Sequence, residues 1–357
     1  MPQRDPGCHA VAGVLLWLDR LASIAVAGRS GGLAASAESR SVLHRGTVEA
    51  VTRGPAGVTR LGSIPEPVGA LPLRIPSPLE ELRDDRLARP GVRLVLKRDD
   101  LINPDVPGNK WRKLKYNLAE AQRLGHRTLL TFGGAYSNHI RATAAAGEYF
   151  GFATIGVIRG EEHLPLNDSL AYAVRHGMRL TYLDRGTYRH KHDPSVIDRL
   201  RQEFGGFYLV PEGGSNGLGV RGCAEIPEEI ANDFDVICCP CGTGGTLAGI
   251  ALGLRPGQRA IGFAVLKNGG FLADEVVRLQ REAVGRDTGC WDIELGYHFG
   301  GYAKTTPELG AFIADFDRRH GLVLDRVYTA KMMYGIMDLA RNGLFASGST
   351  VIAVITG

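Results

Sequence analysis

The feature that most constrains the fold of this chain is an alternation of short apolar runs with stretches of helical period, from Ile75 to the C-terminal residue. The apolar runs have the length of strands, and the stretches between them repeat apolar residues every three or four positions. Parallel strands need crossover connections of this kind, and the connecting helices cover both faces of the sheet. The alternation therefore predicts an α/β protein with mostly parallel sheets. Its strands are expected at residues 94–97, 128–132, 153–158, 178–183, 207–210, 236–239, 261–265, 293–295 and 350–355.

Composition and charge describe an ordinary globular protein. Of the 357 residues, 44% are hydrophobic and 22% are charged, and the net charge is +4. This length suggests two domains, and so mild a charge gives no reason to expect a nucleic acid or a membrane as partner.

Two cysteines form a C-x-x-C pair, Cys238 and Cys241. No second pair and no paired histidines follow, so we expect no metal site and interpret both cysteines as small buried residues at a strand end. A disulfide framework is not expected, which favours a reducing, cytoplasmic compartment.

Residues 1–70 differ from the rest of the chain. They contain seven arginines, five acidic residues and no lysine. Val11 to Ala27 is apolar, but Asp19 and Arg20 interrupt it, so it does not predict a membrane span. A signal peptide, an organellar transit peptide and translation from a wrong start site all remain open. We expect this extension to be poorly ordered and to carry no chemistry.

Lysine is rare in this chain, and three lysines lie together where a helix is expected to begin. The chain has eight lysines against 34 arginines, and Lys110, Lys113 and Lys115 all fall within GNKWRKLK. Arginine would serve equally well on a solvated helix surface, whereas only lysine can become neutral and form a Schiff base with a carbonyl. The stretch therefore indicates either a basic helix surface or a reactive amine.

A glycine-rich turn follows the strand that we expect to end at Cys239, and a helix begins near Thr246. Its backbone N–H groups can point at one anion, and the helix N-terminus adds partial positive charge. It lacks the Gly-Lys-Ser/Thr of a nucleotide P-loop and the Gly-x-Gly-x-x-Gly spacing of a dinucleotide site. It is therefore either a phosphate-binding loop or a tight turn without a ligand, formed by Gly242, Thr243, Gly244, Gly245 and Thr246.

A third segment, TFGGAYSNHIRATAAAG from Thr131 to Gly147, also leads from a strand into a helix. Ser137 and Asn138 lie where this helix begins, and both are ordinary N-cap residues. Helix starts at the ends of strands are also where open α/β proteins bind ligands. The segment thus predicts an N-cap and a ligand contact together, with Asn138 on a cofactor ring substituent and Ser137 facing substrate.

Together GNKWRKL, GGAYSNH and CGTGGT resemble the pyridoxal 5'-phosphate (PLP) enzymes with the tryptophan-synthase-β fold, also called fold type II. Within that group the resemblance is to the 1-aminocyclopropane-1-carboxylate deaminase and D-cysteine desulfhydrase family, over about Ile75 to Gly357. It implies two open twisted sheets, with the cofactor in the cleft between the domains. The large domain would comprise residues 71–117 and 216–357, and the small domain residues 118–215. It also implies a homodimer that acts on a small amino acid.

The resemblance gives roles to several residues. Lys110 would carry the cofactor as a Schiff base, Lys113 would help to hold the phosphate, and the loop of residues 242–246 would surround that phosphate. Asn138 would contact the ring hydroxyl, while Ser137 and His139 would contact the substrate.

The C-terminal part of the chain completes the resemblance. RVYTAKMMYG resembles the family's segment behind the pyridine ring, which implies Tyr328 beside the substrate and Thr329 at the ring nitrogen. Tyr302, in FGGYAKTTPEL, would be a second active-site tyrosine.

Two positions distinguish the branches of this family. The deaminases carry glutamate where this chain has Thr329, and leucine where it has Thr356. A carboxylate favours a protonated pyridine and a stronger electron sink, which cyclopropane opening needs and thiolate expulsion does not. The resemblance therefore implies α,β-elimination from D-cysteine, or a near analogue, to pyruvate, sulfide and ammonia, with Lys110 as the general base. Deamination of 1-aminocyclopropane-1-carboxylate is the alternative, and a catalytically silent PLP-binding protein is the alternative of another class.

Overall fold

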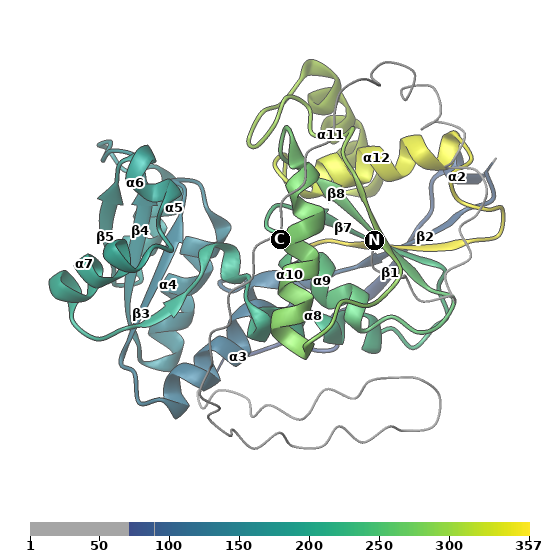
Figure 1. Ribbon diagram of the computed structural model, residues 1–357. Coiled ribbons are helices and arrows are strands. Elements are labelled where there is room, and N and C mark those ends of the chain that lie inside the picture. The colour runs from purple at the N-terminus through teal and green to yellow at the C-terminus, as the bar shows by residue number, and fades with distance from the viewer. Residues whose placement is uncertain (1–70, 89) are drawn as a thin grey trace, which may run out of the picture. The chain divides into compact units, whose positions relative to one another are not determined.

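The computed structural model describes residues 71–88 and 90–357, and these contain two β-sheets (Figure 1). The predictions for residues 1–70 lie outside the described residues. One sheet has six strands in the order β1 (Leu79–Leu82), β2 (Arg93–Lys97), β10 (Thr350–Val354), β7 (Val236–Cys241), β8 (Arg259–Ala264) and β9 (Trp291–Glu294). The other has four strands in the order β5 (Met178–Leu183), β4 (Ala153–Arg159), β3 (Thr128–Gly133) and β6 (Tyr208–Val210).

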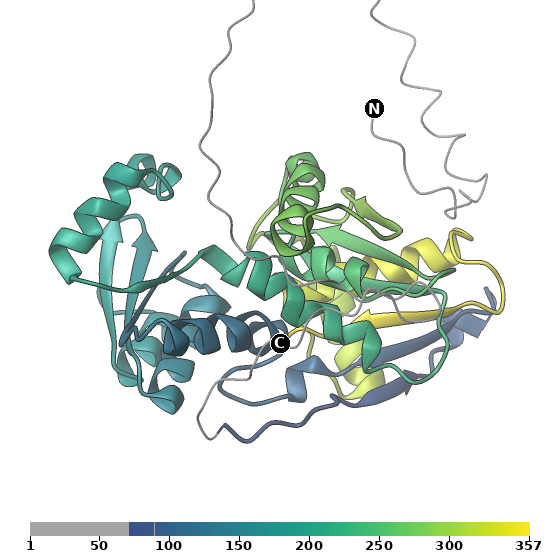
Figure 2. The ribbon, with the colours of Figure 1, turned by 60° about the horizontal axis from the view of Figure 1, so that its bottom comes forward.

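Helices connect these strands, as the alternation in the sequence predicts. Figure 2 shows the same elements from a second direction. The helices are α2 (Asp85–Ala88), α3 (Asn109–Arg123), α4 (Asn138–Phe150), α5 (Asp168–Arg175), α6 (Arg185–Arg189), α7 (Pro194–Phe204), α8 (Gly217–Glu228), α9 (Gly245–Leu252), α10 (Leu272–Val284), α11 (Pro307–His320) and α12 (Thr329–Arg341).

Both sheets are parallel except at one edge, which confirms the predicted α/β class. Only β1 runs antiparallel to its neighbour, β2, among the described strands. The sequence LEEL of β1 has charged residues at its centre, as edge strands often do, and it gives no apolar run to detect. The strand expected to end at Cys239 continues through Pro240 to Cys241, because a proline can extend a strand where its missing N–H is not needed.

Alternate residues of β7 show that both faces of the larger sheet are covered. Cys238 lies in a buried cluster with Met332 and Met333 of α12. Ile237 and Cys239 point the other way, into a cluster built from α8, α9 and α10. A strand buried on both faces is apolar along its whole length, which is why VICC could be recognised from sequence.

The C-x-x-C pair is buried as predicted: Cys238 and Cys241 both lie in β7 as free thiols. Cys290, by contrast, is disulfide-bonded, which departs from the expectation for the cysteines. The described residues contain no group of His, Cys, Asp or Glu arranged to hold a metal ion. No helix in this part of the chain is both long and apolar enough to cross a membrane.

Candidate active site

A cavity of about 790 Å³ gathers most of the residues that the sequence pointed to. The helix starts of α3, α4 and α9 all contribute to its wall, as does the loop before α11. Gly245 and Thr329 are the two predicted site residues that do not line it. The predicted residues in the wall are Lys110, Lys113, Ser137, Asn138, His139, Gly242, Thr243, Gly244, Thr246, Tyr302, Tyr328 and Thr356.

A close backbone approach fixes the start of α3. Gly108 precedes the helix with φ 59°, and a Cβ at this position would lie 1.7 Å from the carbonyl oxygen of Thr356. Only glycine can occupy so crowded a position with positive φ. The approach brings the first turn of α3 against the end of β10 and places Lys110 in the cavity wall.

The amine of Lys110 is suited to attack a carbonyl. Its Nζ donates to Oδ1 of Asn109 over 2.7 Å, and Nδ2 of Asn109 donates to the hydroxyl of Thr246 over 2.9 Å. Burial and the nearby charge of Lys113 lower the pKa of Lys110 to about 7. A large fraction of this amine is therefore neutral, and nucleophilic, at neutral pH.

Lys113 is a buried cation that faces the same cavity. Its side chain lies one turn after Lys110, and its Nζ donates to the hydroxyl of Ser215 over 3.2 Å. That hydroxyl lies 2.6 Å from the hydroxyl of Thr243 in the glycine-rich loop. No carboxylate of the described residues forms an ion pair with Lys113, and burial lowers its pKa. A buried ammonium group without a counter-charge is the kind of group that an anionic ligand would stabilise.

The glycine-rich loop completes an anion-binding surface beside Lys113. A Cβ on Gly245 would lie 2.6 Å from the hydroxyl of Ser215 and 3.3 Å from Nζ of Lys113, so a side chain there would fill the space. Gly244 has φ 77°, and no side chain of the described residues caps the N-terminus of α9. The N–H groups of the loop and the helix start thus remain available to an anion, and these residues fit the phosphate of the PLP that the sequence predicted.

The second helix start confirms that Ser137 is an N-cap. Its hydroxyl accepts from the N–H of Ile140 over 3.4 Å, and Asn138 donates to the carbonyl of Gly357 over the same distance. His139 is buried, with Nε2 2.9 Å from the hydroxyl of Thr131 and with no hydrogen-bond partner for Nδ1 among the described residues. Burial, together with the charges of the two cavity lysines, holds the pKa of His139 well below its ordinary value, so the imidazole is neutral.

Two tyrosines of the cavity wall, Tyr302 and Tyr328, contact each other. The hydroxyl of Tyr328 donates to that of Tyr302 over 3.3 Å, and the rings pack edge to face. Burial, reinforced by Tyr302, raises the pKa of Tyr328 well above its ordinary value, so the hydroxyl of Tyr328 keeps its proton and can donate a hydrogen bond.

Thr329 begins α12 immediately behind this pair. It is buried, and its hydroxyl donates to the backbone carbonyl of Asp325 over 3.3 Å. The carboxylate of Asp325 accepts the backbone N–H groups of Tyr328 and Thr329, over 2.7 and 3.2 Å.

Sequence reasoning missed several residues that hold the site together. Asn109 lies inside GNKWRKL, but only the structure shows that its side chain joins Lys110 to the glycine-rich loop. Ser215 follows the pair Gly213 and Gly214, and that pair was the available signal for a backbone close to a ligand. Asp325 gave no signal, because capping of a helix start depends on where the chain turns.

Comparison with known proteins agrees with this geometry. The chain matches the family described as "Pyridoxal-phosphate dependent enzyme" over residues 71–357. The chain therefore belongs to the family of pyridoxal-phosphate dependent enzymes, which confirms the predicted cofactor and the predicted fold type.

Individual relatives narrow the assignment. A protein of Pyrococcus horikoshii named as a 1-aminocyclopropane-1-carboxylate deaminase is 34% identical over 277 residues, or 75% of this chain and 85% of that protein. The D-cysteine desulfhydrase of Yersinia enterocolitica is 33% identical over 307 residues, or 79% of this chain and 91% of that protein. The crystal structure of an ACC deaminase homologue has a TM-score of 0.71 and 31% identity, over 81% of this chain and 91% of that one. The predicted subfamily is thus confirmed, and the protein is an enzyme of the lyase and deaminase type.

Proposed function

We propose that this enzyme performs α,β-elimination on a small amino acid and that D-cysteine is its preferred substrate. The observation that carries the proposal is the hydroxyl residue at position 329. The nearby carboxylate of Asp325 is already engaged with backbone N–H groups at the start of α12. Without a free carboxylate behind the ring, the pyridine nitrogen stays mostly unprotonated, and such an electron sink suits a substrate with a good leaving group.

The cavity supplies a residue for each task of this reaction. Bound PLP provides an electron-withdrawing ring that stabilises negative charge at the substrate Cα. Lys113 and the loop of residues 242–246 hold its phosphate, and Asn138 holds its ring hydroxyl. Lys110 accepts the Cα proton, which its lowered pKa permits at neutral pH.

Other residues of the wall orient the substrate and its leaving group. Ser137, His139 and Thr356 would contact the amino acid, and the partial positive charge at the N-terminus of α4 would favour its carboxylate. Tyr302 and Tyr328 would supply a proton to the departing thiolate. Thr329, which does not line the cavity, would lie behind the ring.

The organisation of the enzyme follows the family resemblance. We infer a large domain of residues 71–117 and 216–357 and a small domain of residues 118–215, with one sheet in each. We also infer a cytoplasmic homodimer; the thiols of Cys223, Cys238, Cys239 and Cys241 are free and buried, although Cys290 is disulfide-bonded. Light scattering on the purified full chain would measure the oligomeric state.

Ring opening of 1-aminocyclopropane-1-carboxylate is the second candidate, favoured by the name of the relative from Pyrococcus horikoshii. A panel of D-cysteine, L-cysteine, β-chloro-D-alanine, D-serine and the cyclopropane amino acid separates the two. We expect pyruvate and sulfide from D-cysteine, with kcat/KM highest for that substrate. A higher kcat/KM for the cyclopropane amino acid would replace the first proposal with the second.

Substitution of Thr329 tests the argument itself. Thr329→Glu places a negative charge beside the ring nitrogen and raises its pKa, so D-cysteine activity should fall while any cyclopropane activity rises. Thr329→Ser keeps the hydroxyl and serves as the control, with little change expected. Equal effects of the two substitutions would show that position 329 does not select the substrate.

A further inference from the structure

Lys331 is a buried lysine to which the proposed function gives no role. It is the third residue of α12 and is 0% exposed. Its Nζ donates to the backbone carbonyls of His298, over 2.9 Å, and Gly301, over 2.8 Å. No described carboxylate forms an ion pair with it, and burial lowers its pKa to about 8. A cation held by two carbonyl groups instead of a counter-charge is costly to bury, which suggests that the two contacts serve a purpose.

The segment that Lys331 holds is strained. Between β9 and α11 the backbone has positive φ at Phe299 (49°), Gly300 (91°), Gly301 (119°) and Ala303 (55°). For residues other than glycine, this left-handed conformation costs about 1–2 kcal/mol each. Such a backbone persists only where its surroundings impose it, and strained segments of this kind gather at functional sites.

Two further contacts attach the chain between β9 and α11 to α12. The ring of Phe299 packs edge-on against Tyr334, with centroids 5.0 Å apart. The hydroxyl of Tyr297 donates to the carboxylate of Asp338 over 2.9 Å. Positions 331, 334 and 338 follow one another along a single face of a helix. The segment is thus attached to one face of α12 at three successive levels, and Lys331 provides the level nearest the active site.

The attachment by Lys331 lies directly beside the tyrosine pair. Tyr302 follows Gly301, whose carbonyl Lys331 binds, and Tyr328 is the residue before α12 begins. Lys331 itself does not line the cavity, whereas both tyrosines do. We propose that Lys331 is a positioning residue, whose ammonium group holds the strained segment of residues 298–303 against α12 so that Tyr302 reaches the cavity next to Tyr328. The consequence for turnover rests on the proposed function, while the consequence for the segment does not.

Hydrogen exchange measures the effect on the segment without any substrate. Lys331→Met removes both hydrogen bonds but keeps an unbranched side chain of similar length. In the PLP-loaded variant we expect the amides of residues 298–304 to exchange roughly tenfold to a hundredfold faster, as two charge-assisted bonds are lost. Cofactor affinity should be unchanged, because the hydrogen bonds of Lys331 in the described part of the chain go to His298 and Gly301 and not to Lys110, Lys113 or the glycine-rich loop. Unchanged exchange would overturn the proposal.

A double-mutant cycle measures the effect on turnover. If Lys331 acts through Tyr302, Lys331→Met should lower kcat about as much as Tyr302→Phe does, and the double variant should be little worse than either. Additive losses would mean that Lys331 acts on something else and would also overturn the proposal. If the wild type does not turn over D-cysteine, the proposed function fails, and the exchange measurement still decides the role of Lys331.

Two further variants guard against loss of folding and against a general effect of charge. Lys304→Met removes an exposed lysine from the same segment and should change neither exchange nor kcat. If Lys331→Met fails to fold, Lys331→Gln replaces it, because its shorter amide keeps N–H donors and should give exchange rates between those of the wild type and of a free loop. Wild-type exchange in Lys331→Gln, or equal acceleration in Lys304→Met, would contradict the proposal.

Discussion

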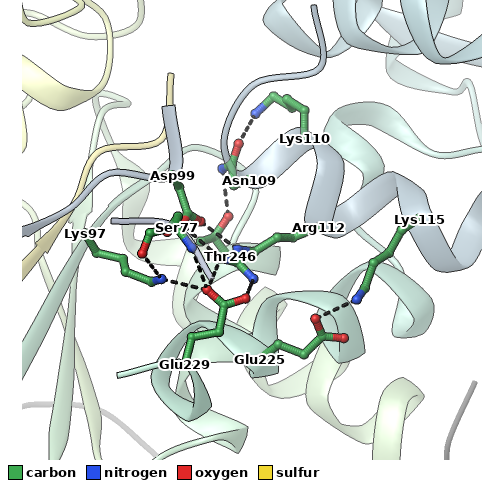
Figure 3. Close-up of polar contacts among 10 residues, drawn as sticks. All are labelled: Ser77, Lys97, Asp99, Asn109, Lys110, Arg112, Lys115, Glu225, Glu229 and Thr246. Atoms are coloured by element: carbon green, nitrogen blue, oxygen red, sulfur yellow. Dashed lines mark hydrogen bonds and ion pairs between the residues drawn. The ribbon is translucent and has the colours of Figure 1, made fainter. Parts of the chain in front are cut away.

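The first two turns of α3 carry cations in two opposite environments, and Figure 3 shows both. Arg112 and Lys115 point toward carboxylates, with Arg112 2.8 Å from Glu229 and Lys115 2.6 Å from Glu225. Lys110 extends away from these carboxylates toward Asn109. Lys113, which the figure does not draw, donates to Ser215 and has no carboxylate partner among the described residues. One short helix start thus holds cations whose charge is balanced within the fold and two lysines whose amines are left for a ligand.

Arg112 belongs to a buried network in which cations and carboxylates pair with each other. Arg112 binds Asp99 and Glu229, while Lys97 binds Glu229 and the carbonyl of Ser77. Two cations and two carboxylates leave no net charge in this buried region. Burial raises the pKa of Glu229, but the bonds from Arg112 and Lys97 outweigh it and lower the pKa to about 2. This network anchors the start of α3 and so fixes where the cavity lysines lie.

The largest expected effect on activity comes from Lys110, one of the two lysines of α3 that line the cavity. Lys110→Ala should lower kcat by more than roughly a thousandfold, because the variant lacks both the covalent attachment point and the general base. Borohydride reduction of the wild type, followed by peptide mapping, should label Lys110. Label on Lys113 or Lys115 would show that the reactive amine has been misplaced.

The next largest effect is expected on stability, when Arg112 is removed from the buried network. Arg112→Met leaves Asp99 buried without a cation and Glu229 with Lys97 alone, which should lower the free energy of unfolding by about 3–5 kcal/mol. Urea unfolding measures this loss, and Arg123→Met, which breaks an exposed pair with Glu120, is the control with little change expected.

The pH dependence of that loss is a further check on the network. Since the pKa of Glu229 is lowered in the folded protein, its contribution is present above the ordinary carboxyl value of 4.5 and is lost as pH falls toward about 2. The difference between Arg112→Met and wild type should therefore shrink in acid. A difference that stays constant between pH 7 and pH 3 would mean that the network does not depend on this carboxylate.

The two sides of α3 also differ in how far sequence could predict them. The alternation of apolar runs located nine strands, because strands buried on both faces are apolar along their length. The motif GNKWRKL marked Lys110 and Lys113, because lysine is rare elsewhere in the chain. It did not separate them from Arg112, whose partners Asp99 and Glu229 lie 13 and 117 positions away. Pairing across such distances depends on tertiary structure, which no local pattern contains.

The surroundings of Thr329 also could not be predicted from the sequence. Its position in the chain is apparent from sequence, but its hydroxyl is engaged by the carbonyl of Asp325, and it does not line the cavity. Lys331 was equally hidden, because its partners are backbone carbonyls, which carry no side-chain signature.

A moderate effect is expected from the second ligand-facing lysine. Lys113→Met should weaken PLP binding by roughly tenfold to a hundredfold, the loss of one charge-assisted contact to phosphate. Titration of the apoprotein with PLP measures the affinity, and Lys115→Met is the matched control, with affinity unchanged because Lys115 faces Glu225.

The same variant should also shift a pH midpoint. The charge of Lys113 contributes to the lowered pKa of Lys110, so its removal should raise that pKa above about 7. The rate at which PLP attaches to the apoprotein rises as Lys110 loses its proton, and in Lys113→Met that rise should move to higher pH. A midpoint that does not move would show that burial alone sets the pKa of Lys110.

The smallest effect is expected from Lys115, which pairs with Glu225. Lys115→Met removes the ion pair with Glu225, but that carboxylate is 24% exposed and also accepts a hydrogen bond from Tyr116. Water and the tyrosine can therefore still solvate it, and the free energy of unfolding should fall by only about 1 kcal/mol. The contrast with Arg112→Met, measured in the same urea titrations, tests whether burial of the carboxylates separates the two cations. Equal losses would mean that Lys115 belongs to the buried network as fully as Arg112 does.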